Sequence, residues 1–394
     1  MSLHPETRTV HQPVPEPRGS RPLGVPIYQQ HQFSFDSADD LAAAFDGPDA
    51  AFFYNRLGNP TVRALEDAVA DLEGGTGALA FASGMGAINA VLLGLLSSGD
   101  HVIAQRCLYG GTYASLCDLA ERWGVEVTFV SGDDAAEVRE ALRPNTRLLY
   151  LETIANPTTQ VVDLPALIAE VAGREIISVV DNTFASPLLC RPLEHGADIV
   201  VHSATKYLGG HGDIVGGVAV FASAELRRRI WDHAIELGAS ADPFAAWLTL
   251  RGMQTLALRM KRQCANALFL AERLGAHPAT TRVYYPSLPS HPGYAIAQRL
   301  LDGGAGGGVL AFDMAGGREA GRIFAEAVRL ALLTPSLGNV QTLVVHPASS
   351  THRQLDAASL AAAGIGEGTV RIAVGIEHPE DLWADFEQAL SKAS

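Results

Sequence analysis

Cysteine is scarce in this sequence, with four residues among 394. No two of them form a CxxC pair, and none clusters with histidine at a spacing typical of a metal site. Scattered cysteines of this kind are usually reduced residues in the core of a cytosolic protein. The pattern therefore argues against a cysteine-based metal centre and favours a cytoplasmic location. The four cysteines are Cys107, Cys117, Cys190 and Cys264.

Positive charge is also in short supply. The chain has 29 Lys and Arg residues against 43 Asp and Glu residues, which gives a formal net charge of −14 and a pI of about 5.3. Nucleic acids and anionic membranes attract proteins through a basic surface, and no segment here resembles one. We therefore expect neither as a partner, while a local cationic pocket for a small anion is compatible with this balance.

A long uninterrupted apolar run is missing as well. The most membrane-like stretch, residues 78–96, is broken by serine, asparagine and several glycines, which favours a buried helix of a soluble protein. The first ten residues carry charges where a signal peptide would have an apolar core. The first 23 residues are rich in Pro, Arg, Glu and His, and they predict an extended arm that is ordered only against another surface.

The sequence has ample material for a large core, because 47% of its residues are hydrophobic and its length allows two or three domains. Between about residues 60 and 221, apolar strand-like runs alternate with helical patterns. This alternation predicts an α/β fold with a mostly parallel sheet, which binds ligands at the carboxyl ends of its strands. The expected strands are 78–81, 101–104, 125–130, 148–151, 176–180, 199–201 and 218–221. The expected helices are 60–73, 87–96, 113–123, 135–142 and 164–172.

The pattern changes after about residue 226. Helical periodicity dominates up to residue 274, and a second, smaller α/β unit follows. Its expected strands are 309–313, 342–345 and 370–374, and a helix at 379–390 closes the chain.

The most informative residues lie where two apolar strands end. Asp181 follows one strand directly, and Lys206 comes shortly after the next. Both are therefore expected at the ligand-binding edge of the sheet. A lysine that faces an aspartate suits pyridoxal 5'-phosphate, since the amine forms the Schiff base and the carboxylate keeps the ring nitrogen protonated. Ser203 and Thr205 could donate hydrogen bonds to the phosphate. The alternative is a surface lysine in a polar loop.

Two further segments are candidates for the same site. Gly84 and Met85 lie between an expected strand and an expected helix, so their backbone N–H groups suit a phosphate, although small residues also pack turns against sheets. Tyr109 follows another strand, where an aromatic ring can stack on a flat cofactor and its hydroxyl can transfer a proton. The alternative is an ordinary tyrosine at the rim.

From about Val25 to the C-terminus, the sequence resembles the Cys/Met-metabolism (cystathionine γ-synthase/γ-lyase) family of pyridoxal-phosphate enzymes, which have the aminotransferase type I fold. The resemblance rests on motifs spread along the chain. They are Tyr54–Thr61, Ser83–Met85, Tyr109–Thr112, Glu152-Thr153 with Asn156-Pro157, Asp181–Phe184, Ser203–Tyr207, Ser336–Gly338, His346–Ala348 with Thr351-His352, and Val370–Gly375.

The resemblance implies a division into an N-terminal arm that contacts a neighbouring subunit (residues 1–58), a large cofactor-binding domain (59–245) and a small C-terminal domain (246–394). It implies a homotetramer, a dimer of dimers with shared active sites.

The resemblance also implies roles for residues of the site. Tyr54 and Arg56 of one subunit would clamp the phosphate in its neighbour, and Tyr54 would also contact the substrate. Asn156 would lie near the cofactor ring or the substrate carboxylate. Arg371, helped by Ser336, would bind that carboxylate through its guanidinium fork.

The reaction implied by the family begins when Lys206 releases the cofactor to an amino acid and shuttles protons, while Tyr109 assists near the leaving group. Loss of the γ-substituent then leads either to a 2-oxo acid and ammonia (γ-elimination) or to capture of a thiol (γ-replacement).

Two departures from the family bear on this choice. Methionine γ-lyases usually carry a cysteine where this chain has Gly111, and this difference argues against methionine as the substrate. Cystathionine-handling enzymes usually carry a glutamate where this chain has Pro335, so a small or apolar γ-substituent is favoured. We expect γ-elimination from a methionine- or homocysteine-like amino acid, with γ-replacement by an O-acylhomoserine sulfhydrylase or cystathionine γ-synthase as the alternative.

Two other classes remain to be weighed. A nicotinamide-dependent oxidoreductase would also have an alternating α/β sheet, but no complete G-x-G-x-x-G follows the first strand. A silent binding protein on this fold would be expected to have lost its lysine, and Lys206 is present.

Overall fold

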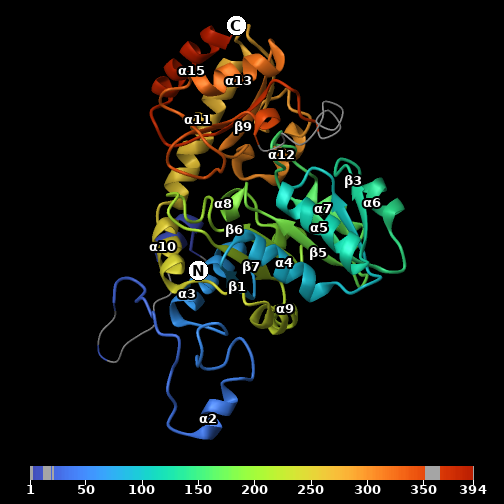
Figure 1. The fold of residues 1–394 in the computed structure, drawn as a ribbon, viewed down its shortest axis with the longest axis vertical. Coiled ribbons are helices and arrows are strands. Elements are labelled where there is room, and N and C mark those ends of the chain that lie inside the picture. The colour runs from blue at the N-terminus through green and yellow to red at the C-terminus, as the bar shows by residue number, and fades with distance from the viewer. Residues whose placement is uncertain (1–2, 12–18, 20–21, 351–363, 394) are drawn as a thin grey trace.

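The computed structural model describes residues 3–11, 19, 22–350 and 364–393. Its larger sheet has seven strands in the order β1-β7-β6-β5-β4-β2-β3 (Figure 1). Strands β2 to β6 pair in parallel, whereas β7 runs antiparallel to both of its neighbours. The predicted mostly parallel sheet is confirmed. The strands are β1 (Gly77–Phe81), β2 (His101–Gln105), β3 (Glu126–Val130), β4 (Thr146–Glu152), β5 (Ile177–Asp181), β6 (Ile199–Ser203) and β7 (Gly217–Phe221).

Helices cover both faces of this sheet, because its central strands are apolar on both sides. One face packs against α4 (Gly84–Leu95), α5 (Gly110–Trp123) and α9 (Ala224–Leu237). The opposite face packs against a second set of helices. That set is α3 (Pro60–Glu73), α6 (Ala135–Ala141), α7 (Leu164–Ala169), α8 (Ser186–Leu189), α10 (Pro243–Met253) and α11 (Leu256–Gly275).

Local capping explains why α3 begins and ends as the sequence predicted. The Asn59 side chain accepts from the backbone N–H of Thr61 (2.9 Å) and Val62 (3.4 Å), and Pro60 occupies the first turn. Gly74 then ends the helix in the left-handed conformation, with φ of 77°.

The smaller sheet has the order β10-β11-β12-β9-β8 and lies at the upper end of Figure 1. Its strands are β8 (Thr280–Tyr284), β9 (Val309–Met314), β10 (Leu332–Leu333), β11 (Leu343–Val345) and β12 (Thr369–Ala373). It shares a separate core with α11, α13 (Gly317–Ala327) and α15 (Pro379–Ala393). The sequence predicted β9, β11, β12 and α15, but not β8 or β10. The proposed boundary at residues 245 and 246 falls inside α10.

The prediction of an extended N-terminal arm is wrong for residues 5–10, which form α1 (Pro5–Val10). This helix packs against its own chain, because Thr9 is buried and Arg8 forms an ion pair with Asp71 at 3.2 Å. Beyond α1, the segment around α2 (Ala38–Ala43) extends away from the large sheet (Figure 1). Its contact with a neighbouring subunit stays a prediction.

The remaining short elements each lie between two strands of the same sheet. They are η1 (Pro192–His195), α12 (Tyr294–Leu300), η2 (Asp302–Gly304) and η3 (Pro347–Ser349). The predicted motif residues Thr351 and His352 lie outside the described residues. Among the helices of the described part, none is long and apolar enough to span a membrane.

Candidate active site

Most of the predicted site residues line one cavity of about 590 Å³ at the carboxyl ends of the central strands. Strand β4 ends at Glu152, β5 at Asp181 and β6 at Ser203, and Lys206 follows β6. Parallel strands end at the same edge of a sheet, so residues far apart in the sequence meet there. The predicted residues at the cavity are Gly84, Met85, Tyr109, Asn156, Asp181, Ser203, Thr205, Lys206, Ser336 and Arg371.

Lys206 presents its amine to the cavity in a fixed position. Its Nζ donates to Ser336 Oγ at 2.7 Å, and its backbone is held by hydrogen bonds to Ser203 and Gly210. Burial and the nearby charge of Arg371 lower the pKa of the Lys206 amine, because both disfavour the ammonium form. A neutral amine is the form that attacks a carbonyl carbon.

The loop after β10 is fitted closely against Lys206. Ser336 has φ of 99°, a left-handed conformation that is rare for serine, and Gly338 has φ of 83°. A Cβ on Gly338 would lie 2.6 Å from the backbone nitrogen of Tyr207, so only glycine fits there. The close packing keeps the Ser336 hydroxyl within reach of the amine.

Asp181 is a buried carboxylate at the edge of the cavity. Its Oδ1 accepts from the backbone N–H of Thr183 at 3.0 Å. Burial raises the pKa of Asp181, while the hydrogen bonds from Thr183 and the nearby His202 oppose that rise. A cationic ring nitrogen placed against Asp181 would therefore favour its charged form.

A fully buried glutamate at the end of α3 holds the carboxyl ends of β5 and β6. Glu73, the last residue of α3, accepts from Asn182 Nδ2 at 2.8 Å and lies 2.6 Å from His202 Nε2. Asn182 follows Asp181, and His202 precedes Ser203. Glu73 therefore ties α3 to the ends of both β5 and β6, where the chemistry-bearing residues begin.

The N-terminus of α4 forms an anion-binding corner beside Ser203. Ser83 caps the helix through the N–H of Gly86 at 3.0 Å, and the N–H groups of Gly84 and Met85 have no partner within the helix. A Cβ on Gly84 would lie 2.8 Å from the Ser203 Cβ, so glycine lets the helix backbone approach the serine. The Thr205 hydroxyl is less available than predicted, because it donates to the Gly216 carbonyl at 3.3 Å and accepts from the Gly216 N–H at 3.0 Å.

Arg371 reaches the cavity from β12 of the smaller sheet. Its two terminal nitrogens donate to Asn156 Oδ1 (2.7 Å) and to the Ser336 carbonyl (2.8 Å), while Nε is buried without a hydrogen-bond partner. Burial lowers the pKa of Arg371 to about 10. A buried guanidinium with neutral partners and one unused donor is ready for a carboxylate.

Tyr109 lies at the mouth of the cavity, immediately before α5. Its ring is half-exposed, and its backbone N–H donates to Glu152 Oε1 at 2.6 Å. A Cβ on Gly111 would lie 2.5 Å from the Tyr109 ring and 2.8 Å from Met85 Sδ. A side chain at position 111 would therefore clash with the Tyr109 ring in this position.

With this geometry established, comparison with known proteins identifies the family. The sequence model described as Cys/Met metabolism PLP-dependent enzyme matches residues 6–391. The chain belongs to this family. It is a pyridoxal-phosphate enzyme, as its sequence predicted.

Relatives within the Cys/Met-metabolism family catalyse different reactions. An L-methionine gamma-lyase of Fusobacterium nucleatum subsp. polymorphum is 45% identical over 375 residues, which cover 94% of each chain. An O-succinylhomoserine sulfhydrylase of Pseudomonas aeruginosa is 41% identical over 369 residues, covering 93% of this chain and 91% of the relative. A crystal structure of cystathionine gamma synthase from Xanthomonas oryzae pv. oryzae in complex with cystathionine has a TM-score of 0.93 and 38% identity, covering 100% of this chain and 99% of that chain.

The cavity fits the cofactor of the Cys/Met-metabolism family. It offers an amine of lowered pKa, a buried carboxylate, and a helix N-terminus that glycine leaves open toward Ser203. These groups match the aldehyde, the ring nitrogen and the phosphate of pyridoxal 5'-phosphate.

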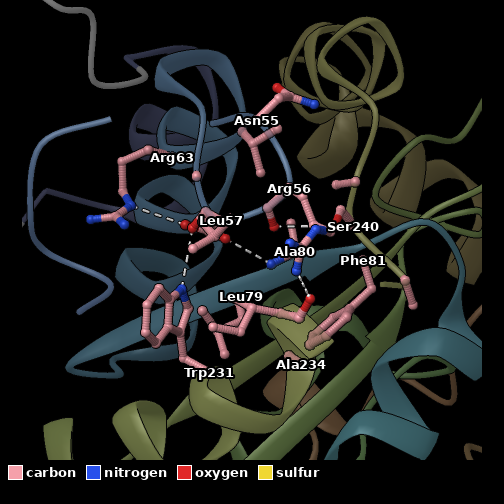
Figure 2. A pocket seen from close by; sticks show the side chains of 16 residues that line it. Asn55, Arg56, Leu57, Arg63, Leu79, Ala80, Phe81, Trp231, Ala234 and Ser240 are labelled. Atoms are coloured by element: carbon pink, nitrogen blue, oxygen red, sulfur yellow. Dashed lines mark hydrogen bonds and ion pairs between the residues drawn. The ribbon is translucent and has the colours of Figure 1, made fainter. Parts of the chain in front are cut away.

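Two predicted site residues, Tyr54 and Arg56, do not line this cavity. Figure 2 shows Arg56 in a separate small pocket, where its guanidinium donates to the Ile235 carbonyl and its own carbonyl accepts from Ser240. The guanidinium carbon lies 5.8 Å from the Tyr54 ring centroid. The predicted phosphate clamp therefore requires the Tyr54 and Arg56 of a second chain.

Sequence reasoning assigned no role to Glu73, Glu152 or His202. The position of Glu152 carried a signal, since a carboxylate at the end of an otherwise apolar strand is expected at the ligand-binding edge. Glu73 carried none, because its partners lie more than 100 residues away along the chain.

Proposed function

We propose that this enzyme catalyses γ-elimination from a methionine-like amino acid, releasing a 2-oxo acid, ammonia and the γ-substituent as a thiol. The observation that carries the proposal is the amine of Lys206, of lowered pKa, in one cavity with Asp181 and Arg371. Pyridoxal 5'-phosphate, when bound, acts as an electron sink for the amino acid.

In the proposed mechanism, Arg371 and Lys206 act on opposite ends of the α-amino acid unit. Arg371 binds the α-carboxylate through its guanidinium, and Asn156 and the Ser336 carbonyl orient that group from behind. The Lys206 amine would then take the proton from Cα of the bound amino acid and hold it on Nζ. Ser336 Oγ holds the amine in position by accepting a hydrogen bond from Lys206 Nζ at 2.7 Å.

The walls of the cavity support a small, uncharged γ-substituent. Among the described residues that line it, the charged side chains are Glu152, Asp181, Lys206 and Arg371, each with a partner or a proposed role. Apolar side chains fill much of the remainder. They are Met85, Ile88, Ile154, Phe184, Pro335 and Leu337. A thioether methyl group gains from such surroundings, whereas the distal ammonium of cystathionine finds no free carboxylate.

Tyr109 is the proposed acid at the leaving group. Its half-exposed ring lines the same cavity as Lys206 and Arg371, whereas Arg371 is buried. A phenol in that place can protonate a departing thiolate.

We also propose that the enzyme is a cytoplasmic homotetramer with shared active sites. The segment around α2 extends away from the large sheet (Figure 1), and Tyr54 is 39% exposed in a single chain. Both features suit an arm that contributes Tyr54 and Arg56 to the cavity of a neighbouring subunit.

γ-Replacement is the second candidate. Gly111, where methionine γ-lyases usually carry cysteine, favours it, as does the sulfhydrylase relative. In that reaction a thiol or sulfide takes the place of the γ-substituent.

The test is to measure 2-oxobutanoate and ammonia released from methionine, homocysteine, cystathionine, O-acetylhomoserine and O-succinylhomoserine, with and without sulfide. The proposal predicts release from methionine or homocysteine without any added thiol. Activity confined to an O-acylhomoserine, and diverted to homocysteine by sulfide, would establish the second candidate instead.

A further inference from the structure

Two acidic residues, not one, occupy the carboxyl ends of neighbouring strands at the cavity. Glu152 on β4 pairs in register with Asp181 on β5, so their side chains lie on the same face of the sheet. Glu152 is only 3% exposed and lines the cavity. Asp181 has a proposed partner in the ring nitrogen of the cofactor, whereas Glu152 has no role in the mechanism above.

The contacts of Glu152 point toward Tyr109. Its Oε1 accepts from the Tyr109 N–H at 2.6 Å, and the backbone of Asn156 also hydrogen-bonds to its carboxyl group. Its own backbone N–H donates to Gln105 Oε1 at 3.0 Å, which fixes the end of β4 against β2. A buried acid on a rigid strand thus reaches the residue that begins α5.

Two hydrogen bonds hold the Tyr109 backbone: its carbonyl accepts from the Tyr113 N–H within α5 at 3.0 Å, and its N–H donates to Glu152 outside the helix. No side chain of its own caps this helix, and the ring of Tyr109 is half-exposed. Gly110 and Gly111 follow directly, and glycine leaves the backbone free to move. Glu152 is therefore the group that ties the Tyr109 backbone to the end of β4, in addition to the bond within α5.

We propose that Glu152 is a positioning residue that holds Tyr109 at the mouth of the cavity through this backbone hydrogen bond. The inference rests on the proposed function of Tyr109 as an acid. Burial and the charge of Asp181 raise the pKa of Glu152 well above its usual range, so a neutral amide should replace its carboxyl group without loss.

The test compares Glu152→Gln, which keeps an oxygen acceptor, with Glu152→Met, which keeps the volume but removes it. Hydrogen exchange is followed in the peptide that contains Tyr109, together with kcat, KM and cofactor absorbance. Faster exchange at Tyr109 and a kcat about 10- to 100-fold lower are expected in Glu152→Met alone, since a small displacement of a catalytic group has costs of that order.

A double-mutant cycle separates positioning from a general structural role. If Glu152 acts through Tyr109, then Glu152→Met should lower kcat by less than about twofold in a Tyr109→Phe background. Glu137→Met is the matched control, because Glu137 accepts from the Ser131 N–H at the same 2.6 Å but does not line the cavity. It should leave kcat unchanged.

Unchanged exchange at Tyr109 in Glu152→Met, or an equal loss of kcat in the Tyr109→Phe background, would overturn the inference. So would a Glu152→Met protein that unfolds or no longer binds cofactor. By contrast, a wild-type rate in Tyr109→Phe would contradict the proposed role of Tyr109, while the exchange experiment would still report whether Glu152 holds it.

Discussion

At the scale of single residues, Lys206 is distinguished from the other lysines of the chain by its burial, and its pKa is lowered. The chain contains three lysines, Lys206, Lys261 and Lys392, and the last two are exposed on α11 and α15. The lowered pKa of Lys206 arises from its burial and from Arg371, which carries the same charge. The charge of Arg371 therefore favours the neutral, nucleophilic form of the Lys206 amine.

We predict that Lys206→Ala abolishes turnover and leaves the fold intact, because the side chain makes one hydrogen bond, to Ser336, and packs at a cavity wall. Release of 2-oxobutanoate and the far-ultraviolet circular dichroism spectrum check both parts. Lys261→Ala serves as the control with wild-type turnover. A Lys206→Ala enzyme with wild-type turnover would remove this residue from the mechanism.

The influence of Arg371 on Lys206 can be measured as a pH dependence. The amine reacts only when neutral, so the rate at which cofactor-free enzyme takes up pyridoxal 5'-phosphate should rise with pH through the lowered pKa of Lys206. Arg371→Met removes a positive charge, which raises that pKa and shifts the midpoint to higher pH. An unchanged midpoint would show that Arg371 does not act on the amine.

At the scale of helices and strands, the regular elements with strong local signals could be predicted from the sequence. Asn59-Pro60 and Gly74 marked both ends of α3, and valine and isoleucine marked β5 and β6. The signals failed where local preference was weak: β10 has two exposed residues, and three of the five residues of β8 are not buried. Helix α1 was missed because its stability comes from contact with α3 and α11.

The cap of α3 should contribute measurably to stability. Asn59→Ala removes the cap and also the hydrogen bond that Asn59 Nδ2 donates to the Tyr28 carbonyl at 2.7 Å. We expect a loss of about 1–2 kcal/mol in the free energy of unfolding. Asp134→Ala, at the exposed cap of α6, should cost less when both are measured by urea denaturation. Equal losses would mean that the second hydrogen bond of Asn59 contributes nothing.

The bracing of β5 and β6 by Glu73 leads to a larger effect. Glu73→Ala leaves Asn182 and His202 buried with a lost partner, so we expect a loss of about 3–5 kcal/mol in the free energy of unfolding. Urea denaturation of the cofactor-free protein measures it. A loss below about 1 kcal/mol would contradict the claim that this carboxylate holds the strand ends.

At the scale of the whole molecule, the cavity combines residues that follow or lie on the strands of both sheets and, as proposed, residues of two chains. Arg371 comes from the smaller sheet and Lys206 from the larger one. From the sequence, Lys206 and Arg371 could be assigned to one site only because their motifs resemble a known family. The distances between them depend on tertiary packing, which no local sequence pattern encodes. Tyr54 and Arg56 mark the limit of the single chain, since they lie away from the cavity.

Sharing of the site between chains predicts complementation. A Lys206→Ala subunit and an Arg56→Ala subunit should each be impaired, Arg56→Ala through weaker cofactor retention. After unfolding and refolding together, half of the dimers would be mixed and would hold one complete site, which gives about a quarter of wild-type activity. Activity no higher than the mean of the two separate variants would argue against a shared site.

The central claim, that Lys206 carries the cofactor, can be tested directly by reducing the pyridoxal-phosphate-loaded enzyme with borohydride. Digestion and mass spectrometry then identify the lysine that carries the pyridoxyl group. We predict modification of Lys206, with Lys261 and Lys392 unmodified. Modification of either other lysine in place of Lys206, or no modification of an enzyme that releases 2-oxobutanoate, would contradict the account.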